Sequence, residues 1–119
     1  MKKIMVCLIA SLSLGFVASS AYASNYSYLN ETPVKYFDDQ DWSLVNAAQQ
    51  KALDRTPDNT KVSWKNPDKK HSGYFIPMHT SHDHGMTCRT LQIFMDADGL
   101  TTLVKFRYCK IKGKWEITR

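Results

Sequence analysis

Apolar and polar residues alternate on both sides of Asp98-Gly99, between residues 88 and 109. An Asp-Gly pair between two runs rich in β-branched and aromatic residues is the strongest local sign of a β-hairpin with a two-residue turn. Counting outward from this turn places Cys88 opposite Cys109. The same count gathers six side chains on one face: Leu91, Ile93, Met95, Thr102, Val104 and Phe106. A slip of one residue would mix the faces and separate the cysteines, so the pattern predicts two antiparallel strands in a fixed register.

A second pattern has apolar residues at helical spacing between Asp38 and Pro57. Asp38 or Asp39 can cap the first turn, and Pro57 ends the segment. The apolar positions form one stripe: Trp42, Val45, Ala48 or Gln49, Ala52 and Leu53. A helix with a single apolar stripe needs a sheet to cover it.

The remaining segments alternate like strands. Residues 61–65 place Val62 and Trp64 on one face, and a turn at 66–68 leads to a second strand over 73–78, followed by a polar loop. A turn at Lys112-Gly113 leads to a short last strand, in which Trp115 opposes Lys110 and Ile117 opposes Tyr108. We therefore predict one α+β domain, with one helix packed on a four- to five-stranded antiparallel meander sheet that carries one disulfide.

The N-terminus has the order of a secretory signal peptide. Lys2 and Lys3 precede an apolar run over 4–17, and small residues at 21 and 23 fit a cleavage site. No other segment is long and apolar enough to span a membrane. The sequence predicts a signal peptide over 1–23, an extended N-terminal arm over 24–37 and one domain over 38–119. We expect an exported protein, in a periplasm, at a cell surface or outside the cell.

Removal of Cys7 with the signal peptide leaves two cysteines, Cys88 and Cys109. Exported compartments are oxidising, and the hairpin register places these residues at a non-hydrogen-bonded pair, where the Cα atoms approach closely enough for a disulfide. Such a bridge stabilises a small domain by about 2–4 kcal/mol. A redox-active role is not favoured, because the chain has no Cys-x-x-Cys spacing.

Charge and motifs exclude several classes of function. The full chain carries a net charge of +5, and loss of Lys2 and Lys3 leaves +3. The basic residues are scattered among acidic ones, whereas nucleic-acid binding needs a dense basic stripe, so no nucleic-acid partner is expected. No nucleophile elbow, phosphate-binding loop or His-Glu-x-x-His motif is present. We expect a protein that is not an enzyme and that contacts envelope or surface proteins.

Three histidines, His79, His82 and His84, cluster in the polar loop after the second strand. Imidazoles at this spacing could coordinate Zn²⁺, Cu²⁺ or Ni²⁺, which makes a periplasmic metal-binding protein the alternative function. A polar loop tip that happens to be rich in histidine is the other interpretation, because an exposed loop offers little preorganisation. No cofactor is expected otherwise.

From Ala52 onward the sequence resembles the C-terminal domain of bacterial surface antigens of the rickettsial seventeen-kilodalton type. The elements that carry the resemblance are Ala52-Leu53, Pro57-Asp58-Asn59-Thr60, Val62-Ser63-Trp64-Lys65-Asn66-Pro67, Gly73-x-x-x-Pro77, Cys88-Arg89, Tyr108-Cys109-Lys110 and Gly113-Lys114-Trp115. The resemblance implies an envelope or surface protein without catalytic residues. The lipid-acceptor cysteine and the glycine-zipper segment of many such antigens are not found here.

Arg89 is the unusual residue among these shared positions. It lies on the apolar side of the predicted hairpin, so its guanidinium must reach solvent or find a carboxylate or carbonyl partner. We interpret Arg89 as structural, with a binding role as the alternative.

Overall fold

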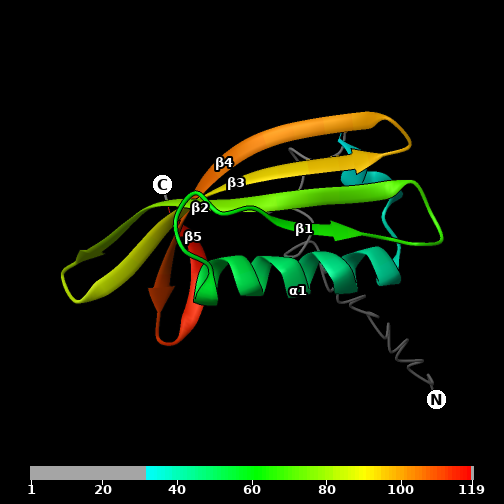
Figure 1. Cartoon of the computed structure of the whole chain (residues 1–119). Coiled ribbons are helices and arrows are strands. Elements are labelled where there is room, and N and C mark those ends of the chain that lie inside the picture. Colours follow the sequence, from blue (N-terminus) through cyan, green and yellow to red (C-terminus); the bar gives the residue numbers. More distant parts are fainter. Residues whose placement is uncertain (1–31, 119) are drawn as a thin grey trace, which may run out of the picture.

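The structure is a computed structural model, and it describes residues 32–118. In chain order its elements are a 3₁₀ helix η3 (Pro33–Tyr36), helix α1 (Asp39–Arg55) and strands β1 (Val62–Lys65), β2 (His71–Asp83), β3 (Met86–Ala97), β4 (Leu100–Ile111) and β5 (Lys114–Thr118). The strands form one antiparallel sheet in the order β1-β2-β3-β4-β5, and α1 lies against one of its faces (Figure 1). The predicted fold class is confirmed.

The hairpin of β3 and β4 has the predicted register at every pair. Ala97 faces Leu100 beside the turn, and Cys88 faces Cys109 at the far end. Asp98 and Gly99 both have positive φ angles, of 54° and 89°, as a two-residue turn that follows the twist of the strands requires. The last hairpin is also as predicted, because Trp115 pairs with Lys110 and Ile117 with Tyr108.

Helix α1 begins with a reciprocal cap. The Asp38 carboxylate accepts a hydrogen bond from the Asp41 amide at 3.0 Å, and the Asp41 carboxylate accepts one from the Asp38 amide at 2.9 Å. The helix buries most of its predicted apolar stripe: Val45, Ala48, Ala52 and Leu53. It ends at Arg55, two residues before Pro57. Local sequence therefore sets both ends of α1, and the sheet covers its apolar side.

The core lies between α1 and the inner face of the sheet, the face toward α1. A close approach there depends on Gly73, opposite Trp64 in the β1–β2 ladder. A Cβ atom at Gly73 would lie 2.3 Å from the Phe94 carbonyl oxygen and 2.7 Å from Trp64 Nε1. No side chain fits in that space, so only glycine lets the Trp64 indole lie against β2.

Two segments differ from the sequence prediction. β2 runs on to Asp83 through a bulge between Met78 and Ser81, and a tight turn at His84-Gly85 replaces the predicted polar loop. Polar residues form a strand there because they pair with β3 while their side chains face solvent. The described end of the N-terminal arm is a 3₁₀ turn with a buried Pro33, where an extended chain was predicted. The predicted signal peptide and the rest of the arm lie outside the described residues.

Candidate functional site

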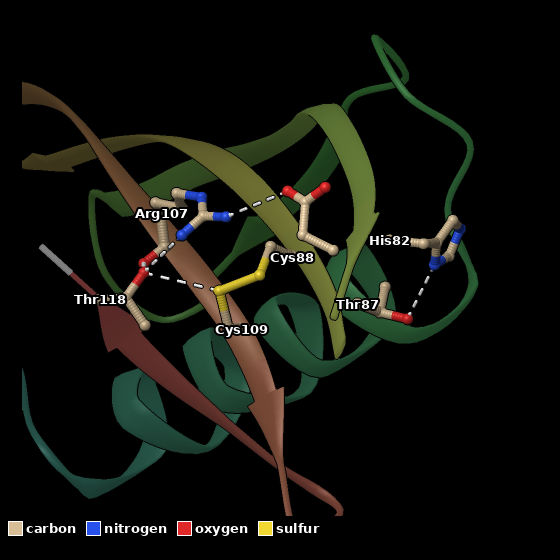
Figure 2. The surroundings of a disulfide bond; sticks show 7 residues. His82, Thr87, Cys88, Arg107, Cys109 and Thr118 are labelled. Carbon is tan, nitrogen blue, oxygen red and sulfur yellow. Dashed lines mark hydrogen bonds and ion pairs between the residues drawn. A yellow bond between two sulfur atoms is a disulfide. The ribbon is translucent and has the colours of Figure 1, made fainter. Parts of the chain in front are cut away.

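The predicted disulfide is present between β3 and β4. Cys88 and Cys109 are joined across the non-hydrogen-bonded pair, with their Cα atoms 4.0 Å apart and both residues buried (Figure 2). Thr118 Oγ1 lies 3.6 Å from Cys109 Sγ, and the Arg107 guanidinium contacts both the Thr118 hydroxyl and the Asp83 carboxylate. Side chains from three strands thus surround the bridge.

The side chain of Arg89 lies on the other face of β3, beneath the C-terminal end of α1. Its Nη1 donates to the carbonyl oxygens of Ala52 and Leu53, both at 2.9 Å. These carbonyls belong to the last turn of α1, where no helical amide is available to pair with them. The positive charge also suits the negative end of the helix dipole. Arg89 therefore acts as a cap on α1 that is supplied from the sheet.

The remaining donors of Arg89 bind the segment that follows the helix. Nη2 donates to the Thr56 carbonyl and, at 3.0 Å, to the Asp58 carboxylate, and Nε donates to Thr80 Oγ1 at 2.8 Å. The guanidinium has thus found both the carbonyl and the carboxylate partners that its buried position demands. A binding role for Arg89 stays a prediction, and a ligand would have to displace one of these bonds.

The electrostatics of this site are centred on Asp58. Its carboxylate accepts from the Thr80 hydroxyl at 2.6 Å and from the Thr80 amide at 3.1 Å, in addition to the bond from Arg89. Hydrogen bonds from Thr80 and then from Arg89 lower the pKa of Asp58 to about 2. Asp58 is therefore ionised at neutral pH and holds the β2 bulge against the end of α1.

The three predicted metal-ligating histidines are exposed and lie along the β2–β3 hairpin. His79 is in the bulge with a φ angle of 51°, and His84 is in the turn with a φ angle of 53°. His82 lies between them, with its Nδ1 3.1 Å from Thr87 Oγ1 (Figure 2). Across residues 32–118, no three His, Cys, Asp or Glu side chains are grouped so that they could hold a metal ion. The metal role stays a prediction.

Sequence reasoning missed the one buried histidine, His71. Its Nδ1 lies 2.9 Å from the carboxylate of Asp41, which is fully buried, and its Nε2 lies 3.3 Å from the carboxylate of Asp98. The Asn66 side-chain amide donates to the same Asp41 carboxylate at 2.8 Å. The cluster joins the start of α1 to two turns of the sheet. The sequence does contain one signal for the burial of His71. Residues two apart in a strand lie on the same face, and Gly73 lies on the inner face.

The charge state of His71 decides what this cluster can do. The hydrogen bond with Asp41, and then the one with Asp98, raise the pKa of His71 above its usual value. In the protonated form both ring nitrogens donate to carboxylates, so neither has a lone pair with which to accept a proton. An open depression of about 290 Å³ beside His71 is lined by lysines and by acidic and small residues: Lys65, Lys69, Lys70, Ser72, Asp96 and Gly99.

Comparisons with known proteins give one consistent relationship. The chain is 42% identical over 53 residues to the 17 kDa surface antigen of Rickettsia felis, a match that covers 44% of this chain and 33% of the relative. It is 42% identical over 43 residues to the 17 kDa surface antigen of Rickettsia canadensis, covering 36% of this chain and 54% of the relative. For the Rickettsia prowazekii antigen the identity is 36% over 53 residues, covering 44% of this chain and 33% of the relative.

These matches are partial, since they span between a third and about half the length of the curated relatives. No protein-family model and no solved structure matches the chain. Within residues 32–118, no helix has the length and hydropathy needed to cross a membrane. The matches nevertheless agree with the resemblance inferred from the residues, because part of this chain is similar to the rickettsial 17 kDa surface antigens.

Proposed function

We propose that this protein is an exported component of a bacterial envelope or cell surface, and that it acts through contacts with other proteins or surfaces. The observation that carries the location is the Cys88–Cys109 disulfide. Structural disulfides form and persist in oxidising compartments, whereas cytosolic proteins keep their thiols reduced. The predicted signal peptide over 1–23 and the surface-antigen relatives support the same location.

A role without catalysis is supported by how the reactive groups of the described domain are used. The thiols of Cys88 and Cys109 are joined to each other. Arg89 donates to the end of α1, and both nitrogens of His71 face carboxylates. Groups that could act as nucleophile, anion-binding residue or base therefore hold secondary structure together. A domain of this size needs such reinforcement, because it buries only a small core.

The location can be tested by trapping thiols in growing bacteria that express the full chain. Cells are quenched with acid, and free thiols are labelled with a maleimide polymer before and after reduction. We expect the protein in the periplasmic or envelope fraction, with Cys88 and Cys109 labelled only after reduction. A matched chain that starts with Met followed by Ser24 should stay in the cytoplasm with both thiols reactive. A full-length chain found reduced in the cytoplasm would contradict the proposal.

Exposure at the cell surface is a separate measurement. An amine-reactive reagent that does not cross membranes is applied to intact cells and to cells with a permeabilised outer membrane. Labelling of intact cells would assign the protein to the surface, and labelling only after permeabilisation would assign it to the periplasm. Recovery of one specific partner by crosslinking in intact cells would support the contact role, and turnover of a substrate by the purified protein would contradict it.

A further inference from the structure

Strand β4 has a long edge that no other strand among residues 32–118 covers. β5 pairs only with residues 107–111 of β4, whereas β3 pairs with residues 100–109. Residues 100–105 therefore form a border of the sheet next to the β3–β4 turn, and no other strand among residues 32–118 lies on that side (Figure 1). An unpaired strand edge is a template for another strand, because its outward N–H and C=O groups have no partner in the sheet.

The hairpin register shows which backbone groups face outward. In a two-residue hairpin the pair beside the turn, Ala97 and Leu100, is hydrogen-bonded, and such pairs alternate along the ladder. The groups of Thr102 and Val104 thus point toward β3. Those of Thr101, Leu103 and Lys105 point away from it. Each chain presents three outward N–H donors and three outward C=O acceptors, one of each per residue.

The side chains of this edge are mostly apolar. Leu103 is 57% exposed on the outer face, the face away from α1, and Leu100 is 41% exposed on the inner face. Lys105 carries the single charge between residues 100 and 106. Natural edges are usually protected by several charges, a proline or a bulge. In this segment the structure shows no bulge and the sequence has no proline, so the edge is weakly protected.

We propose that two copies of this chain pair antiparallel through the β4 edge, about a two-fold axis at Leu103. In this register Leu103 faces its own copy, and Thr101 faces Lys105 of the other copy. All three outward residues then exchange hydrogen bonds with the partner, which satisfies every outward donor and acceptor of both chains. The exposed Leu103 side chains cover each other on the outer face.

This register is the most favourable of the symmetric ones. An axis at Lys105 would place two lysines directly opposite each other, which is destabilising. An axis at Thr101 would extend into the turn at Asp98-Gly99 and leave Lys105 unpaired. Helix α1 packs on β1 and β2, away from the β4 edge, whereas η3 contacts β3 and β4. The paired sheets would continue as one, with both helices on the same face.

The register makes a sharp prediction for cysteine crosslinking, which does not depend on where the protein is located. The full chain is expressed with Cys7→Ser to remove the unpaired thiol, and either Leu103→Cys or Thr101→Cys is added. Across a hydrogen-bonded pair the Cα atoms of two residues 103 would lie about 5.5 Å apart, within disulfide range. Two residues 101, on the same edge and face, would lie roughly 14 Å apart.

We expect Leu103→Cys to give a covalent dimer under mild oxidation. The yield of covalent dimer from Thr101→Cys should be at least roughly tenfold lower, because it would form only through random collisions. Equal crosslinking at the two positions, or no dimer with Leu103→Cys, would overturn the proposal. Thermal unfolding of both variants confirms that each is folded before crosslinking.

A second measurement uses mass in solution. Sedimentation of the protein obtained from the full chain should show a dimer that dissociates on dilution. Leu103→Lys places two ammonium groups at the axis and should raise the dissociation constant roughly tenfold or more. Ser63→Lys adds the same charge to the exposed outer face of β1, at the opposite edge, and should leave the dimer unchanged. A monomer at all concentrations, or equal effects of the two variants, would overturn the proposal.

Discussion

Cys88 and Arg89 are neighbours in β3 whose side chains secure opposite faces of the sheet. Cys88 is joined to Cys109 of β4, and Arg89 caps α1 through the carbonyl oxygens of Ala52 and Leu53. Successive residues of a strand point to opposite faces, so two neighbouring residues of β3 can bind one element on each face of the sheet.

Removal of the Arg89 side chain should strongly destabilise the protein. Arg89→Met keeps the apolar stem, but it leaves the carbonyl oxygens of Ala52, Leu53 and Thr56 without the guanidinium donor and removes one of the bonds to Asp58. We expect a loss of about 3 kcal/mol in the free energy of unfolding, measured by urea denaturation. Arg89→Lys, the matched control, keeps the charge and should recover part of the loss. A loss of less than about 1 kcal/mol for Arg89→Met would show that water replaces the guanidinium without cost.

The disulfide should contribute a comparable amount. Replacement of both Cys88 and Cys109 by alanine should lower the free energy of unfolding by about 2–4 kcal/mol, because the open hairpin gains freedom in the unfolded chain. Unfolding in urea with and without a strong reductant measures the same quantity on the unchanged protein. Cys7→Ser is the control and should have no effect. Equal stability of the oxidised and reduced protein would contradict this prediction.

Stability should also depend on pH through His71. Its pKa is raised in the folded state from 6.5, mainly by the hydrogen bond with Asp41. The stabilisation is therefore complete below the unfolded pKa and is lost as the pH rises through the folded value. We expect the free energy of unfolding to fall between slightly acidic and mildly alkaline pH, and His71→Gln to remove that dependence. His82→Gln, at an exposed position, should keep it, and a slope unaffected by His71→Gln would assign the effect elsewhere.

The histidine hairpin can be tested by calorimetric titration with Zn²⁺ and Cu²⁺. His79, His82 and His84 are not brought together among residues 32–118, so we expect binding no tighter than that of an unstructured histidine-rich peptide. Stoichiometric submicromolar binding that disappears in the double variant His82→Ala/His84→Ala would instead support the metal-binding hypothesis. His71→Gln serves as the control, because that ring is buried and far along the strand.

The parts of the fold that the sequence predicted correctly are those fixed by local chemistry. The Asp98-Gly99 turn sets the register of β3 and β4, and that register brings the two cysteines together. The Asp38 cap and Pro57 set the limits of α1 in the same way. A turn or a cap involves residues close in sequence, so its signal is visible without knowledge of the fold.

The parts that were missed depend on contacts between distant residues. Asp41 and His71 are separated by 30 positions, and no local pattern shows that a cap residue of α1 also binds the start of β2. The bulge after Met78 rests on Asp58, which binds the Thr80 amide from another segment. Residues 79–83 were predicted as a loop because they are polar. They pair with β3 without the alternating apolar residues by which a strand is recognised in a sequence.

The meander topology has a consequence for how the cystine forms. Every strand of the sheet lies beside its neighbour in the chain, so the sheet can assemble by successive closure of short segments. Within the hairpin of residues 88–109, the turn alone aligns the two sulfur atoms. The segment between Cys88 and Cys109 is short, so forming the disulfide closes only a short loop. In the exported protein proposed above, the hairpin alone would therefore present the two thiols to an oxidant as an aligned pair.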